Sequence, residues 1–427
     1  MIAMIVFAVL VILMVFKVPI AIGTALATIV GIFFVGTLPP AVMVQRMYVG
    51  LDTFTLIAVP LFILTGRLMA LGGITTDLIN LSRVLVGYLR GGLAYINIVS
   101  SMFFAGITGS AASDTSSVGA ILIPAMLEKG YEKDFSVAVT ATSSTIGVMI
   151  PPSIPMVIYG VAAGASIGRL FLGGLIPGVI VGLALMAVTF VVARKRNYPV
   201  EERISFGASV RIVLKGIPAL FTIVVIVGGI VSGVFTPTEA AGIAALYSFL
   251  LGVLFYRELK LRDLPGILVD VATTTGMVAL MIATASALGW LFANQGIPRL
   301  IGGAILSVTD NRIIILMLIN LLLLFVGTWL DLSPAVIIFT PILLPIVTVL
   351  GIDPVHFGVV MVVNLAIGLF TPPVGVCLFV SCGIAGISIS DTVRAFIPYF
   401  LVMVGVLLLI TYVPELVMFL PNLLMPQ

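Results

Sequence analysis

Two Pro-Pro pairs lie inside apolar stretches, where each would leave backbone oxygens without their usual partners. The pairs are Pro151-Pro152 and Pro372-Pro373. Proline has no N–H to donate to the carbonyl four residues earlier. The carbonyls that this is expected to free are those of Gly147, Val148, Gly368 and Leu369. Because a glycine lets a ligand approach the backbone closely, each segment is expected to present oxygen ligands.

Polar residues interrupt another apolar stretch upstream of each pair. The first interruption, at 106–114, supplies Thr108, Ser110, Ser113 and Asp114, and the second, at 327–334, supplies Thr328 and Asp331. Oxygen ligands with at most one carboxylate per site suit a hard monovalent cation better than a divalent one. Sodium is therefore the natural candidate.

A structural interpretation competes with this one. The prolines could form kinks whose free carbonyls are satisfied by nearby hydroxyls and waters, but their occurrence in two copies favours a binding role. Asp114 precedes an apolar helix and could cap it, so the cap and ligand roles both stay open. For Asp331, Ser333-Pro334 already resembles a helix start, which favours a role in ion or substrate handling.

The two sets of residues belong to an internal repeat. Moving residues 106–177 forward by 221 positions superimposes a set of helix breakers without a gap, for example Gly147 on Gly368 and Pro151-Pro152 on Pro372-Pro373. Paired, Gly/Pro-interrupted apolar segments in two halves indicate the binding site of a secondary transporter. Basic residues follow the last helix of the first copy, at 194–215, but Arg394 precedes the matching helix of the second. This reversal predicts an inverted repeat.

Composition identifies a polytopic all-α membrane protein. Hydrophobic residues make up 61% of the 427 and charged residues 9%, against about 25% charged in soluble domains. A net charge of +3, from scattered basic residues, gives no reason to expect a nucleic-acid partner. Residues 1–16 lack a basic flank and a cleavage site, so we expect a retained membrane segment and no signal peptide.

The interrupted stretches predict two re-entrant helical hairpins. Arms of about 15 residues rise about 23 Å, too short to cross about 30 Å of hydrocarbon. Discontinuous helices are expected at the Pro-Pro pairs, and amphipathic interfacial helices at 40–52 and 74–90.

Four regions of the chain result. They are 1–91, scaffold helices with an interfacial arm; 92–193, the first repeat, with a hairpin at about 92–129 and a broken helix at about 135–165; 194–310, a central basic loop, scaffold helices and a second arm; and 311–427, the second repeat, with a hairpin at about 311–350, a broken helix at about 356–385 and a terminal helix.

Other motifs favour structural roles. Thr236-Pro237-Thr238-Glu239 predicts a capping box at a helix start. Trp290 is expected to pack or anchor, whereas Trp329, in the second tip, could equally contact a solute. Cys377 and Cys382 are expected to be structural, because their spacing of five does not place them on one helical face.

Three segments together resemble the large membrane subunit of tripartite ATP-independent periplasmic (TRAP) transporters, the DctM-like family. They are Gly109-Ser110-Ala111-Ala112-Ser113-Asp114-Thr115, Phe235-Thr236-Pro237-Thr238-Glu239-Ala240-Ala241-Gly242 and Leu369-Phe370-Thr371-Pro372-Pro373-Val374-Gly375. The resemblance implies a sodium-coupled, elevator-type importer in the bacterial inner membrane. It also implies a small carboxylate substrate of the sialic acid or C4-dicarboxylate type, and two partners: a four-helix DctQ-like membrane subunit, expected as a separate chain, and a periplasmic substrate-binding protein.

The resemblance also implies three sets of site residues. The first sodium site would use Ser110, Ser113, Asp114, Gly147 and Pro151, and the second Thr328, Asp331, Gly368, Thr371 and Pro373. Substrate would lie between them, at Thr108, Ser143, Ser144, Asn364 and Asp331. Sodium is the coupling ion, and no organic cofactor is expected.

Three other functions are less favoured. A self-sufficient sodium- or proton-coupled symporter or antiporter for anions would share the architecture but need no binding protein. An intramembrane enzyme is disfavoured because the sequence has no HExxH motif and no nucleophile with a plausible base. An ATP-driven pump is disfavoured because no GxxxxGK[ST] loop is present.

Overall fold

The chain is helical throughout the part that the computed structural model describes, which is residues 2–16, 18–200, 204–297 and 311–426. The extended pairing in these ranges is an isolated bridge between Arg90 and Val200. Seven helical segments in them are long and apolar enough to cross a membrane. The predicted class, an all-α polytopic membrane protein, is therefore confirmed.

The internal repeat is present as two matching runs of helices. The first comprises α6 (Gly92–Thr108), α7 (Ala111–Glu128), α8 (Lys133–Ser143), α9 (Ile154–Ala163) and α10 (Ile167–Lys195). The second comprises α16 (Arg312–Gly327), α17 (Leu332–Val349), α18 (Pro354–Gly368), α19 (Val376–Ala385) and α20 (Ile389–Tyr412). Moving α7 forward by 221 positions gives the bounds of α17, so the offset read from glycines and prolines also relates the helices.

The two runs interlock in a reciprocal way. α7 packs against α19, and α17 packs against α9; likewise α8 packs against α20, and α18 against α10. Each contact has a counterpart in which the copies exchange roles, as expected for units related by a two-fold axis. The re-entrant path of the hairpins and the inverted orientation of the copies in the membrane remain predictions.

Both hairpin tips are short. Gly109 and Ser110 alone join α6 to α7. The polar run at 106–114 predicted a longer break, but Gly109 turns the chain with a φ of 62° and Ser110 caps α7 by accepting the N–H of Ser113 at 3.4 Å. In the second tip α17 begins at Leu332, with Asp331 at the N-cap position. The expectation that Ser333-Pro334 starts this helix is therefore wrong.

The predicted discontinuous helices are confirmed. A 3-10 turn, η2 (Ser144–Val148), follows α8, and residues 149–153 lead from it to α9. In the second copy, residues 369–375 lead from α18 to α19. Both Pro-Pro bonds are cis. The first break is buried, whereas Pro372 and Pro373 of the second are exposed.

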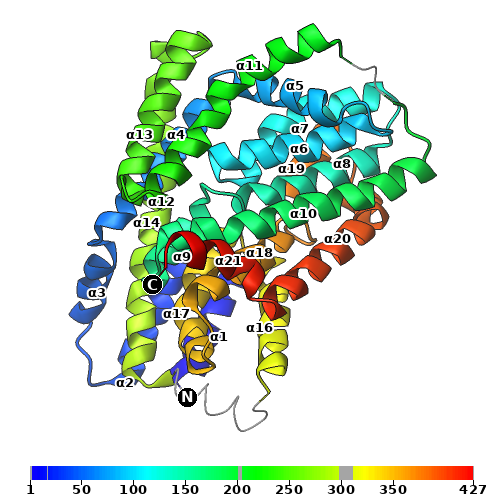
Figure 1. The fold of residues 1–427 in the computed structure, drawn as a ribbon. Coiled ribbons are helices and arrows are strands. Elements are labelled where there is room, and N and C mark those ends of the chain that lie inside the picture. Colours follow the sequence, from blue (N-terminus) through cyan, green and yellow to red (C-terminus); the bar gives the residue numbers. More distant parts are fainter. Residues whose placement is uncertain (1, 17, 201–203, 298–310, 427) are drawn as a thin grey trace.

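The other helices form a group that flanks the two runs (Figure 1). They are α1 (Ile2–Val15), α2 (Ile20–Val35), α3 (Ala41–Leu51), η1 (Phe54–Ile57), α4 (Ala58–Leu71), α5 (Ile74–Val86), α11 (Phe206–Ile223), η3 (Val224–Gly228), α12 (Gly229–Val231), α13 (Pro237–Leu250), η4 (Leu251–Phe255), η5 (Leu261–Asp263) and α14 (Leu264–Asn294). The last helix, α21 (Glu415–Leu424), packs instead against α10 and α18 of the runs. α4 packs against α13 and α14, and α14 against α2 and α3. Contacts of α4 with α6 and of α14 with α17 join this group to the repeat.

Two expectations about the flanking group can be compared with the structure. The amphipathic segments at 40–52 and 74–90 form α3 and α5, and α5 packs on α6 and α11. The second arm is expected within 194–310 without narrower bounds, and residues 298–310 of that region lie outside the described residues. α11 begins at Phe206, so part of the expected basic loop is helical.

Candidate functional site

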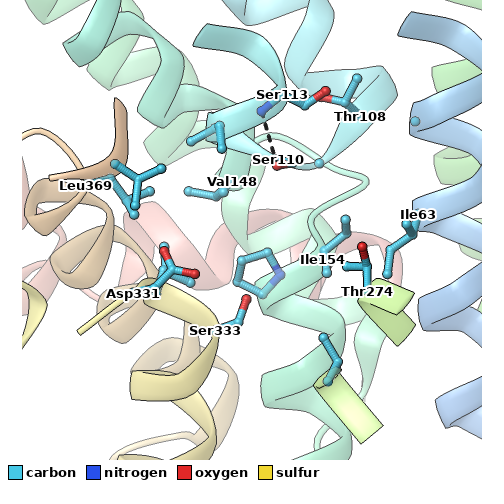
Figure 2. Close-up of a pocket in the computed structure, with 18 of the residues that line it drawn as sticks. Ile63, Thr108, Ser110, Ser113, Val148, Ile154, Thr274, Asp331, Ser333 and Leu369 are labelled. Carbon is cyan, nitrogen blue, oxygen red and sulfur yellow. Dashed lines mark hydrogen bonds between the residues drawn. The ribbon is translucent and has the colours of Figure 1, made fainter. Parts of the chain in front are cut away.

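A cavity of about 350 Å³ lies where the two hairpin tips meet the flanking helices. The first tip contributes residues 108–113, and the second contributes residues 331–333. α4 and α14 supply a third wall. In Figure 2, Asp331 lies on the side of the cavity away from Ile63 of α4 and Thr274 of α14. The volume is that of a site for a small organic molecule.

The first turns of α7 and α17 both line this cavity. Ser110 to Ser113 begin α7, and Asp331 to Ser333 begin α17. The first amides of a helix lack intrahelical partners and carry the positive end of its dipole. The cavity is thus built to receive an anionic group.

Asp114 points away from the cavity into a buried polar cluster. Its Oδ2 accepts a hydrogen bond from Ser101 Oγ at 2.7 Å, and Ser101 Oγ lies 3.2 Å from Ser143 Oγ. Ser143 in turn donates to Asn97 Oδ1 at 3.2 Å. Asp114 Oδ1 is buried and has no hydrogen-bond partner among the described residues. Since Ser110 caps α7, the capping role considered for Asp114 is wrong, and the open carboxylate oxygen suits a cation.

The Gly147 carbonyl is a second oxygen in the first copy that receives no hydrogen bond from the described residues. Its two possible helical donors are unavailable, because residue 151 is proline and the Ile150 N–H donates to Ile146 instead, at 3.2 Å. Gly147 also lies against the first tip, where an added Cβ would be 3.4 Å from the Ser110 carbonyl. The expectation for Val148 is wrong, because its carbonyl accepts the Ser153 hydroxyl at 2.6 Å.

The second copy differs. The Gly368 carbonyl accepts the N–H of Thr371 at 3.1 Å, and the Leu369 carbonyl accepts that of Cys377 at 2.9 Å. The expectation that these two carbonyls are free is therefore wrong, because the chain after the break folds back and supplies other donors. Each oxygen keeps a second lone pair.

Each tip is tied to the break of its own copy. Ile154 donates its N–H to the Gly109 carbonyl at 3.3 Å, and Val374 donates to the Thr328 carbonyl at 3.2 Å. The Thr328 and Thr371 hydroxyls donate to carbonyls of their own helices, at 2.8 and 2.6 Å. Thr328, Gly368 and Thr371 of the predicted second ion site thus lie where the tip meets the break, with both threonine hydroxyls donating to carbonyls. Asp331 lines the cavity.

The predicted site residues fall into three groups, one of which, the second-ion-site residues Thr328, Gly368, Thr371 and Pro373, does not line the cavity. Thr108, Ser110, Ser113 and Asp331 line the cavity. Other members are buried and do not line it; they are Asp114, Ser143, Ser144, Gly147, Pro151 and Asn364. Ser144 donates to the Thr140 carbonyl at 2.8 Å, and Asn364 donates to Asn320 Oδ1 at 2.9 Å. The expected contact of Ser143, Ser144 and Asn364 with substrate is not supported by these positions.

Arg67 is a cavity residue that the sequence argument missed. It lies on α4, lines the cavity and is exposed. Its signal was a lone charge in the apolar stretch 54–71. Trp290 has the packing role expected of it, because its partly buried ring packs against the hydrophobic core, and the Arg46 guanidinium lies 4.7 Å from the ring centre.

Comparison with known proteins gives consistent matches. Residues 7–416 match the family described as the tripartite ATP-independent periplasmic transporter, DctM component. The chain is 45% identical to the uncharacterized protein YgiK of Salmonella typhimurium, over 96% of this chain and 95% of that one. It is 44% identical to the isethionate TRAP transporter permease protein DctMQ of Oleidesulfovibrio alaskensis, over 94% of this chain and 64% of the other. It is 40% identical to the sialic acid TRAP transporter large permease protein SiaM of Vibrio cholerae, over 89% of each chain.

A solved structure shares the fold. The YdaH transporter of Alcanivorax borkumensis superimposes with a TM-score of 0.62 at 14% identity, over 89% of this chain and 88% of that one. At this identity the similarity concerns the fold alone.

Proposed function

The chain belongs to the DctM family of large TRAP transporter components, and from this premise we propose that it imports a carboxylate-bearing solute by sodium-coupled, binding-protein-dependent transport. Relatives are named for sialic acid, C4-dicarboxylates and isethionate, which are all small organic anions. A cavity lined by two helix N-termini supports a solute of this class.

The observation that carries the sodium proposal is the pair of open, buried oxygens behind the first tip. Asp114 Oδ1 and the Gly147 carbonyl would ligate the first ion, with Ser110, Ser113 and the Pro151 segment around them. Oxygen donors and a single carboxylate suit sodium. An ion there would hold the first break against the tip that lines the cavity, so its binding would order the solute site.

A second sodium site is proposed at the other tip. It would use Thr328, Asp331, Gly368, Thr371 and Pro373. The hydrogen bond between Val374 and the Thr328 carbonyl supports it, because it brings this tip and its break together. The solute would lie between the two ions, against Thr108 and Asp331.

The proposed transport motion is that of an elevator. The two interlocked runs would move together past the flanking helices. The cavity supports this proposal because its walls come from both parts: the tips from the runs, and α4 and α14 from the flanking group. Sliding of one part past the other would carry the solute across the membrane.

Two partners are proposed in the bacterial inner membrane and the periplasm. They are a small four-helix membrane component and a soluble binding protein that delivers the solute. One relative, named DctMQ, is longer than this chain, which covers 64% of it.

Reconstitution tests the proposal. Liposomes would contain this chain with its small component, and the binding protein would be added outside under an inward sodium gradient. We expect uptake of labelled solute that requires both the gradient and the binding protein. Uptake indifferent to sodium would refute the coupling, and full uptake without the binding protein would instead support a self-sufficient symporter.

A further inference from the structure

The cavity carries opposite charges on facing walls. Arg67 follows Ile63 by four residues on α4, so the two side chains share the helix face that lines the cavity. Asp331 lies on the side away from Ile63 (Figure 2). In the described part of the chain, no salt bridge joins Arg67 to Asp331 or to another acid. Both charges are therefore available to a solute.

The backbone of α4 places Arg67 beside the first tip. A Cβ added at Gly66 would lie 3.1 Å from the Cα and the carbonyl oxygen of Thr108. Ser110 to Ser113, the first turn of α7, follow within the same cavity wall. The guanidinium and the amides of this helix start therefore form one positively charged end.

The other end of the cavity has a different balance of charge. The first turn of α17 is also positive, but Asp331 stands at its N-cap position and its carboxylate offsets the dipole. A sodium ion on Asp331 would cancel the carboxylate and leave only the partial positive charge of the helix start, so this end stays less positive than the first end with its guanidinium. A hydroxyl or amino group, which can donate to a carboxylate, suits it better.

We infer that Arg67 binds the anionic group of the solute and that Asp331 accepts a hydrogen bond from a hydroxyl or amino group at its other end. The site then selects hydroxylated monoanions, carboxylate or sulfonate, over dicarboxylates. Arginine matches the planar fork of a carboxylate with two parallel hydrogen bonds. This inference rests on the proposed function for its role in transport, since it names the class of solute that the importer carries.

Thermal stabilisation of the purified chain tests the inference without requiring transport, because a ligand raises the melting temperature of the state it binds. The probes are isethionate and sialic acid, both hydroxylated monoanions, and succinate. We expect the first two to stabilise the wild type at lower concentration than succinate. In R67Q the concentration of isethionate or sialic acid that gives half-maximal stabilisation should rise about ten- to hundredfold, because charge-assisted hydrogen bonds are lost. R67K should recover part of the loss. R211Q, on an exposed part of α11 away from the cavity, should match the wild type.

D331N provides the complementary test. It removes the negative charge at the second end, so the stabilisation by succinate should increase relative to that by isethionate and sialic acid. The inference is overturned if R67Q and wild type respond alike, if succinate is the best ligand of the wild type, or if none of the three anions stabilises it. Stabilisation that depends on Arg67, without sodium-driven uptake in liposomes, would support this binding mode and refute the proposed import. Uptake with binding independent of Arg67 would refute this inference alone.

Discussion

Replacing Gly368 with alanine should separate the second tip from its break. An added Cβ at this position would lie 2.7 Å from the Cα of Gly327 at the end of α16, and nearer still to its carbonyl. An ordinary contact begins at 3.4 Å, so the Gly327 Cα would have to retreat by about 0.7 Å, and backbone cannot rotate out of the way as a side chain can. Overpacking of this kind costs about 1–3 kcal/mol.

The matched control is Gly405 in α20, where an added Cβ would meet no atom within 4 Å. G405A should therefore be stabilising by about 0.5–1 kcal/mol through helix propensity. The assay is thermal unfolding of the purified proteins in detergent, followed by sodium titration of solute uptake. We expect G368A to melt below the wild type and G405A at or above it, with the half-saturating sodium concentration raised in G368A alone. If G368A has the same melting temperature as G405A and keeps the wild-type sodium dependence of uptake, then stability and sodium binding do not require close packing of the tip against the break.

Three further predictions concern other parts of the chain. D114N keeps a group that accepts from Ser101 but removes the charge, so the half-saturating sodium concentration should rise at least about tenfold, while D270N on the exposed face of α14 should leave it unchanged. The Thr236 hydroxyl caps α13 by accepting the Glu239 N–H at 3.3 Å, so T236A should destabilise the protein by about 1 kcal/mol in thermal unfolding. Hydrogen bonds from Arg196 at 2.8 and 2.9 Å hold the pKa of Asp134 below its usual range. The wild type should therefore be more stable than D134N above about pH 4, and this difference in stability should disappear as the pH falls further. A difference in stability that persists at low pH would contradict this explanation.

The repeat could be predicted from the sequence because glycine and proline act on the backbone itself. Pro151 and Pro372 remove an N–H wherever they stand, so the breaks fell where expected, and the matched bounds of α7 and α17 follow from one offset. The capping box at Thr236 was predicted for the same reason: its bonds connect residues three apart and need no tertiary information.

The cavity wall could not be predicted in the same way. Arg67 comes from α4, which lies outside the duplicated segment 106–177, so comparison of the copies could not reach it. Its position depends on how the flanking helices pack against the tips, which is a long-range property. A charge in an apolar stretch signals function, but the sequence does not say which cavity it faces.

The copies also differ in the oxygens they leave open, and one pair of aligned residues explains much of that difference. Ser153 caps α9 and donates its hydroxyl to the Val148 carbonyl at 2.6 Å. The aligned residue, Val374, has no hydroxyl, and the matching Leu369 carbonyl is met by a backbone N–H from α19. The first break is buried beside an unpaired Asp114 oxygen, and only its edges, Val148 and Ile154, line the cavity, whereas Pro372 and Pro373 of the second break are exposed. A buried, closed site suits an ion, and an open one suits exchange of a larger solute. The asymmetry therefore makes the first break the more enclosed of the two proposed sodium sites, and leaves the second sodium site open beside the solute cavity.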